Sequence, residues 1–186
     1  MKSDLVFVVF SFLIMVRKGN SMTYELINEM KVNASANDIW AVYSSPDLPK
    51  LVNKFLPGAI ERIDYVKGNG GVGTILRIVF PPGSVPLSYK EKFITIDSRR
   101  LLKEVLHIEG GYLAMGVTFY IERFKIIKKS CNSCIIRSII EYEVPDKLAA
   151  NISPLISVDG FVTMATAISK YVLDNKKNGY IPCLAN

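Results

Sequence analysis

The stretch that most constrains the fold is Asp159–Lys177, near the end of the chain. Apolar residues recur there with the spacing of one face of an α-helix, at Phe161, Met164, Ala165, Ile168 and Val172. Charged residues lie off this stripe, so one side of the helix needs an apolar surface to cover it. Most of the preceding chain has strand-like patterns. The sequence therefore predicts an α+β domain whose C-terminal helix lies across an antiparallel sheet.

Seven segments before this helix are typical of strands, and turn residues separate them. They cover residues 23–32, 60–66, 73–80, 87–96, 101–108, 112–127 and 133–144. Two short helices are also predicted, one that Ser35 caps and that runs to Tyr43, and one over residues 51–56. With 186 residues, 49% of them apolar, the chain can bury a core of its own. We predict one domain over residues 22–177 and a flexible tail over residues 178–186.

Residues 5–16 form an apolar run close to the start of the chain. A bilayer span needs about 20 residues, so this run does not predict a stable membrane helix. Lys2 before the run, with Gly19 and Ser21 after it, resembles a secretory signal over residues 1–21. A working leader would direct the protein to the endoplasmic reticulum and secretory pathway or the vacuole. Met22 as the start would instead give a cytoplasmic product.

Several other classes of site are disfavoured by the sequence. The net charge is +6, but the basic residues are scattered and not set in a stripe with aromatics, so nucleic acid is not an expected partner. The three cysteines do not suggest a disulfide framework. Gly68, Gly70 and Gly73 match the spacing of a dinucleotide-binding loop, but a strand follows them where such a loop needs a helix. We interpret this segment as a glycine-rich hairpin.

Two predicted strands each carry a glutamate between aromatic residues on one face: Tyr89, Glu91 and Phe93 in one, and Tyr120, Glu122 and Phe124 in the other. Burying a carboxylate without a partner is costly, so these glutamates call for an explanation. On the strand between, Lys103 shares the parity of Val105 and His107.

If all three faces look inward, Lys103 meets Glu91 and Glu122 in a tyrosine-lined space. Mutual charge and desolvation would then shift their pKa values toward those of a working acid–base pair. The alternative is a set of cross-strand ion pairs on a solvent-exposed face. His107 is the sole histidine. No motif for a metal site or a nucleophilic triad surrounds it in the sequence, and we expect it to be a polar residue that fills the cavity.

Three motifs carry a resemblance to a known family: Gly70–Leu76 (GGVGTIL), Tyr89–Phe93 (YKEKF) and Ile108–Leu113 (IEGGYL). With the order of elements, they resemble the plant pathogenesis-related class 10 (Bet v 1-like) family and, within it, the norcoclaurine synthases. The resemblance covers about residues 22–175. It implies a seven-stranded antiparallel sheet wrapped around the long C-terminal helix, with two short helices and an internal cavity.

The resemblance also implies a Pictet–Spengler condensation of dopamine with 4-hydroxyphenylacetaldehyde to (S)-norcoclaurine, in alkaloid biosynthesis. No cofactor and no metal are expected. By position, Lys103, Glu91 and Tyr89 match the catalytic lysine, glutamate and tyrosine, whereas Glu122 stands where the family has an aspartate. We expect the substrate cavity to be lined by Phe93, Tyr112, Tyr120, Phe124 and Met164.

Two alternatives remain open at this point. A ligand carrier or pathogenesis-related protein of the same fold would need the cavity but not Lys103 and Glu91 together. A diverged enzyme that condenses another amine with another aldehyde is also compatible with Glu122, whose extra methylene moves the carboxylate. The expected partners are small molecules, with at most a weak homodimer.

Overall fold

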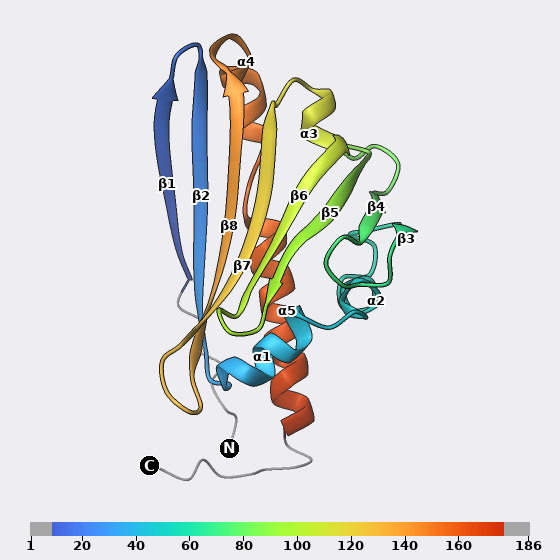
Figure 1. Cartoon of the computed structure of the whole chain (residues 1–186), viewed down its shortest axis with the longest axis vertical. Helices are drawn as coiled ribbons and strands as arrows, with labels where there is room; N and C mark the ends of the chain where they lie inside the picture. Colours follow the sequence, from blue (N-terminus) through green and yellow to red (C-terminus); the bar gives the residue numbers. More distant parts are fainter. Residues whose placement is uncertain (1–8, 177–186) are drawn as a thin grey trace.

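An antiparallel sheet forms one side of the molecule (Figure 1), in a computed structural model that describes residues 9–176. The sheet has eight strands in the order β1-β2-β8-β7-β6-β5-β4-β3. Their bounds are β1 Val9–Lys18, β2 Ser21–Val32, β3 Arg62–Lys67, β4 Ile75–Val79, β5 Ser88–Asp97, β6 Leu102–Gly110, β7 Phe119–Lys128 and β8 Cys134–Pro145. Each strand is antiparallel to its neighbours, so the predicted meander from β3 to β8 is confirmed.

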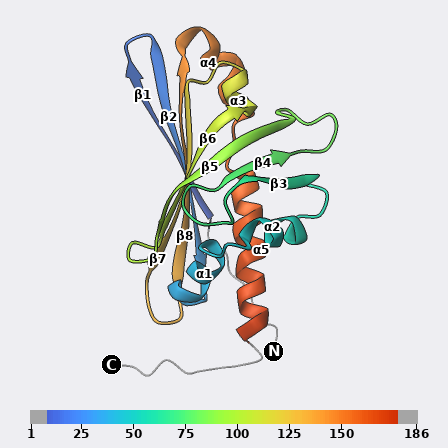
Figure 2. The same ribbon diagram turned by 45° about the vertical axis from the view of Figure 1, so that its right-hand side comes forward.

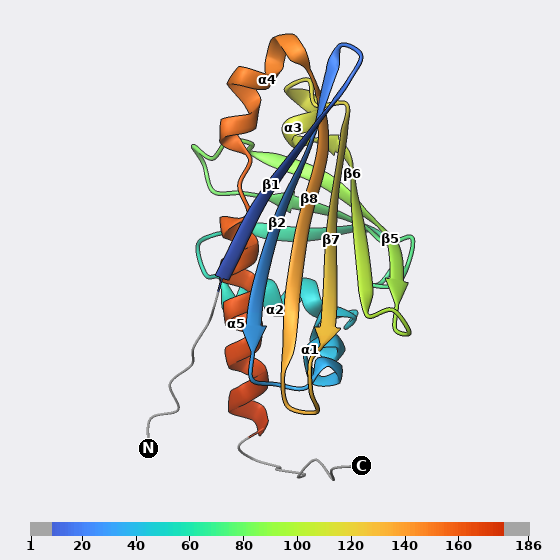
Figure 3. The same cartoon turned by 90° about the vertical axis from the view of Figure 1, so that its left-hand side faces the viewer.

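The sheet therefore has one strand more than the seven predicted, and the additional strand is β1. It pairs with β2 along its length at the edge of the sheet, where Figure 3 shows the two strands side by side. Its apolar side chains from Phe12 to Val16 are exposed, with Phe12 at 54% and Met15 at 56% of full exposure. This part of β1 thus extends the sheet without contributing to the core. A secretory leader over residues 1–21 stays a prediction, and residues 1–8 lie outside the described part of the chain.

The predicted strand over residues 112–127 begins too early. The chain forms a short helix, α3 (Gly111–Ala114), and β7 begins only at Phe119. Gly110, Gly111 and Gly116 have φ values of 73°, 56° and 107°. These left-handed conformations suit glycine and interrupt the extended backbone. Strand periodicity alone did not reveal this break.

The two short predicted helices are present as α1 (Ala36–Tyr43) and α2 (Leu48–Phe55). Ser35 caps α1, because its hydroxyl oxygen accepts a hydrogen bond from the Asp38 backbone N–H at 3.1 Å. α2 begins earlier than predicted, with Pro49 in its first turn, where a missing N–H costs nothing. After β8 come α4 (Asp146–Ile152), the 3-10 turn η1 (Ser153–Leu155) and α5 (Asp159–Lys176).

α5 lies along the sheet with α2 beside it, as Figure 2 shows. The apolar side chains of its predicted stripe belong to the hydrophobic core together with residues of the sheet. Ala165 and Ile168 are fully buried, and Val172 is 6% exposed. By length and composition, Asp146–Asn175 is the one described helical stretch that could cross a membrane. Here η1 interrupts this stretch, and the apolar side of α5 fills the core.

The glycine-rich segment joins β3 to β4 as a turn, as predicted. The Gly70 N–H donates to the Thr74 hydroxyl oxygen at 2.9 Å, and a strand follows. Because β4 follows the glycines in place of a helix, the segment lacks the element whose N-terminus receives the pyrophosphate group in a dinucleotide-binding loop. Cys131 is exposed and Cys134 is buried, and neither takes part in a disulfide among the described residues. Cys183 and the predicted tail over residues 178–186 lie outside the described residues.

Candidate active site

A cavity lies between the sheet and α5. One part has a volume of about 350 Å³ and a second part about 270 Å³. Both are lined by Phe80, Tyr89, Glu122, Gly160 and Phe161, so the two parts share a wall. Such dimensions suit small organic ligands.

The two parts of the cavity divide the predicted residues between them. Glu91, Phe93, Lys103, Phe124 and Met164 line the larger part only. His107, Tyr112 and Tyr120 line the smaller part only, whereas Tyr89 and Glu122 line both. The structure therefore brings the predicted set of residues to one space. Phe80 and Phe161 also belong to the shared wall but were not predicted as site residues, although Phe161 lies on the apolar stripe of the last helix.

Strand register explains why the charged residues face inward. Glu91 on β5 lies opposite His107 on β6, and Val105 on β6 lies opposite Glu122 on β7. Because side chains alternate along each strand, these residues share the face that α5 covers. On the other face, Lys90 makes an ion pair with Glu109 at 2.8 Å. The predicted parity of the strands is therefore correct.

Lys103 is 1% exposed, so the solvent-exposed alternative is wrong for this lysine. Its ammonium donates to the Tyr43 carbonyl oxygen at 3.3 Å and lies 3.9 Å from the centre of the Phe93 ring. Within the described residues, no carboxylate oxygen lies within 4.0 Å of the Lys103 ammonium. Burial lowers the pKa of Lys103 to about 8, and the charge of Glu91 offsets part of that effect. Lys103 can thus donate a proton near neutral pH.

Glu91 is 8% exposed, and its pKa shifts in the direction opposite to that of Lys103. Burial, followed by the charge of Glu122, raises the pKa of Glu91 to about 7. His107 and Lys103 act against this rise, as does a hydrogen bond with Tyr89. Burial and the neighbouring Glu91 raise the pKa of the Tyr89 hydroxyl in turn. The cavity therefore contains an acid and a base whose pKa values bracket pH 7 to 8.

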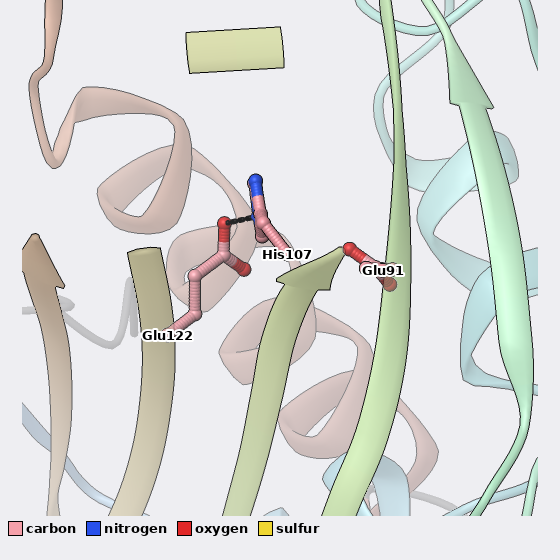
Figure 4. Close-up of side chains that lie close together, drawn as sticks. All are labelled: Glu91, His107 and Glu122. Carbon is pink, nitrogen blue, oxygen red and sulfur yellow. Dashed lines mark hydrogen bonds and ion pairs between the residues drawn. The ribbon is translucent and has the colours of Figure 1, made fainter. Parts of the chain in front are cut away.

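His107 lies beside Glu122, as Figure 4 shows, with Nε2 2.8 Å from the carboxylate Oε1. Its ring stacks on Tyr89 with centroids 4.2 Å apart, and Tyr120 lies 4.3 Å away. Sequence reasoning expected a polar residue that fills the cavity but missed this hydrogen bond. The two residues share the inward parity of neighbouring strands and are diagonal to each other, a relation within reach of long side chains.

The same cluster could hold a cation. Ligand atoms of Glu91, His107 and Glu122 all lie within 4.8 Å of one another. Nitrogen and carboxylate oxygen are ligands that zinc accepts, so a metal-ligating group can be assembled around His107, contrary to the expectation from sequence. A cation there would have to displace the His107–Glu122 hydrogen bond and tolerate the nearby Lys103 ammonium.

Comparison with known proteins supports the fold and identifies the family of the chain. Residues 21–175 match the Pathogenesis-related protein Bet v 1 family. The chain is 48% identical over 162 residues to S-norcoclaurine synthase 2 of Papaver somniferum, and the match covers 87% of this chain and 70% of that protein. It is 44% identical over 161 residues to S-norcoclaurine synthase of Thalictrum flavum subsp. glaucum, covering 87% of this chain and 76% of that protein.

Among solved structures, norcoclaurine synthase from Thalictrum flavum in complex with dopamine and hydroxybenzaldehyde superposes with a TM-score of 0.81. The identity is 44%, and the match covers 89% of this chain and 98% of that one. The predicted Bet v 1-like fold is confirmed, apart from the strand number. This chain is a member of the Bet v 1 family.

Proposed function

We propose that this protein is a norcoclaurine synthase, which condenses dopamine with 4-hydroxyphenylacetaldehyde to (S)-norcoclaurine. The observation that carries the proposal is the enclosure of Lys103 and Glu91 in one cavity, with pKa values of about 8 and about 7. Relatives that are 44% and 48% identical are norcoclaurine synthases. A solved relative binds dopamine and an aldehyde.

The first stage joins the two substrates. The amine nitrogen adds to the aldehyde carbon and forms a carbinolamine. The Lys103 ammonium then donates a proton to the departing hydroxyl group, which leaves as water and creates an iminium ion. A pKa of about 8 keeps most of the lysine protonated at pH 7 and still makes it a better donor than an exposed lysine.

The second stage closes the new ring. A carbon of the activated catechol ring attacks the iminium carbon, and Glu91 removes the proton that the attacked ring carbon must lose to restore aromaticity. A pKa of about 7 is well placed for this transfer. Tyr89 positions Glu91 through their hydrogen bond. Glu122, at the wall between the two parts of the cavity, stabilises the positive charge of the intermediate. The rest of the rate enhancement comes from holding both substrates in one orientation.

A direct assay tests the proposal against the carrier and the diverged-enzyme alternatives. Purified protein is incubated with dopamine and a panel of aldehydes, and the products are separated by chiral chromatography. We expect enzyme-dependent (S)-norcoclaurine from 4-hydroxyphenylacetaldehyde. Dopamine binding without any product would favour a carrier. Product from other aldehydes only would favour an enzyme with another substrate.

We also propose that residues 1–21 direct the protein into the secretory pathway, because an apolar run follows Lys2 and small residues follow the run. A fluorescent reporter fused after the full segment should enter the endoplasmic reticulum of plant cells. A diffuse cytosolic signal would contradict this and favour Met22 as the start.

A further inference from the structure

We propose that His107 is a positioning residue, which donates a hydrogen bond from Nε2 to Glu122 and holds that carboxylate group in place at the wall between the two parts of the cavity. The proposal rests on the proposed function, because it assigns Glu122 a role toward the reacting molecules. It concerns a contact between neighbouring strands, β6 and β7, and both side chains are more than nine-tenths buried.

The hydrogen bond has a defined direction. An ionised carboxylate can only accept, so Nε2 must carry the hydrogen in the 2.8 Å contact with Glu122. The other ring nitrogen, Nδ1, is buried and has no hydrogen-bond partner among the described residues. The one side-chain hydrogen bond of the ring among the described residues is therefore the contact with Glu122, and it identifies Nε2 as the nitrogen that donates.

Two aromatic rings hold the imidazole in this orientation. Tyr89 stacks on it with an angle of 14° between the planes, and Tyr120 lies against it at 34°. Both tyrosines belong to the cavity wall. The ring therefore has little freedom to rotate, and its Nε2–H keeps one direction. A rigid donor is what allows a neighbouring carboxylate to keep one rotamer.

Glu122 needs such a donor because its other near neighbour is Glu91. The charge of Glu122 is among the causes that raise the pKa of Glu91, so the two carboxylate groups repel each other when both are charged. The structure gives Glu122 one hydrogen bond among the described side chains, the one from His107. Without it, the carboxylate group would turn away from Glu91 and would no longer lie at the shared wall.

Two variants separate the hydrogen bond from the packing. His107→Gln keeps an amide N–H where Nε2 was but removes the ring, whereas His107→Phe keeps a stacking ring and removes the donor. We expect His107→Phe to lower kcat by about ten- to a hundredfold, the range for losing a hydrogen bond to a charged group. KM should change by less than about threefold, and His107→Gln should stay within about threefold of wild-type kcat. The reverse pattern, or normal kcat in both variants, would overturn the proposal.

Thermal unfolding of each variant shows whether it folds, and His107→Met replaces the Phe variant if that one does not. Histidine NMR gives a readout independent of turnover, because the chain has one histidine. We expect the Nε2–H tautomer with a downfield proton signal that moves upfield in Glu122→Gln. An Nδ1–H tautomer in the wild type would contradict the proposal. If the wild type forms no product at all, the proposed function fails, and the NMR result still decides whether His107 holds Glu122.

Discussion

At the scale of single residues, the site is determined by how three charged side chains are buried together. Lys103 is more completely enclosed than most of the apolar core, yet no carboxylate lies close enough for an ion pair among the described residues. Such a lysine is expensive to bury. Its place beside a carboxylate with a raised pKa is typical of acid–base chemistry and not of a structural ion pair.

We predict that Lys103→Met lowers turnover by about 100-fold or more, the usual range for losing a general acid. Methionine keeps the apolar stem and removes the proton donor. The melting temperature should hold or rise, because an ammonium no longer has to be desolvated. Steady-state turnover and thermal unfolding measure the two effects.

Lys90→Met is the matched control for this substitution. Lys90 is next to Glu91 in sequence but pairs with Glu109 on the other face of the sheet. Its substitution should change turnover little, because an exposed ion pair contributes little. Near-normal turnover in Lys103→Met would leave only a ligand-binding cavity and favour the carrier.

The pKa values also predict how activity depends on pH. Ionised Glu91 is needed as the base and protonated Lys103 as the acid, so kcat/KM should rise through about pH 7 and fall through about pH 8. In Glu91→Gln the rise on the acid side should disappear together with most of the activity. A pH–rate profile of both proteins measures this. A wild-type profile that is flat from pH 6 to 9 would contradict the assignment.

On the acid side, the stability of the folded protein should decrease as the pH rises, whereas the activity increases. Between pH 4.5 and about 7 the folded protein keeps the Glu91 proton that the unfolded chain has already lost. The contribution of Glu91 is therefore fully present at low pH and is lost as the pH rises through 7. Thermal unfolding at pH 5 and pH 7.5 should show a smaller decrease in Glu91→Gln than in the wild type. Equal decreases would mean that Glu91 titrates normally.

At the scale of elements, the strands position the side chains of the site, and the turns connect the strands in the arrangement that this requires. β5, β6 and β7 bring Glu91, Lys103 and Glu122 to one face, although the register between β5 and β6 shifts on either side of the segment from Glu91 to Phe93. The turn between β3 and β4 closes against the break between α1 and α2. There Gly70 lies against Pro46, in a conformation with φ of 103°.

We predict that Gly70→Ala destabilises the protein by about 2 kcal/mol or more, because a Cβ there would lie 2.6 Å from the Pro46 carbonyl oxygen. This corresponds to a melting temperature roughly 5 °C lower. Gly71→Ala is the control, since the nearest atom to its Cβ would be 4.0 Å away. Thermal unfolding compares the two variants. Equal losses would mean that the contact with Pro46 does not limit the turn.

At the scale of the whole molecule, the sheet, α2 and α5 together enclose the cavity, and β1 lies outside that arrangement. β1 adds to the far edge, where its pairing partner is β2. The described residues of β1 are absent from both hydrophobic clusters of the core. The family match also begins at residue 21.

We predict that a protein lacking residues 1–21 folds and keeps its turnover, with a melting temperature within about 3 °C of the full chain. The reason is that β1 buries little apolar surface, and apolar burial is the main source of stability. Thermal unfolding, gel filtration and turnover of the two proteins provide the comparison. Aggregation of the shortened protein, or loss of its cooperative transition, would show that β1 belongs to the fold.

Local patterns were sufficient for most elements of this protein. The stripe on α5, the Ser35 cap of α1 and the alternation of six strands are properties of short segments, so periodicity and capping chemistry reveal them without a structure. The same alternation grouped Lys103 with His107, and each glutamate with its aromatic neighbours, but it left open whether those faces look inward. Resemblance of three short motifs supplied the family and the expected chemistry.

Only the tertiary structure decided what those side chains meet. The partners of Lys103 come from α1 and β5, and the hydrogen bond of His107 depends on the register between β6 and β7. Pairing of β1 with β2 and the break at α3 were likewise absent from the local pattern. Register, burial and pKa shifts all arise from contacts between residues far apart in the chain. Periodicity within one segment carries no information about them, and that is why the site's electrostatics appeared only in the folded molecule.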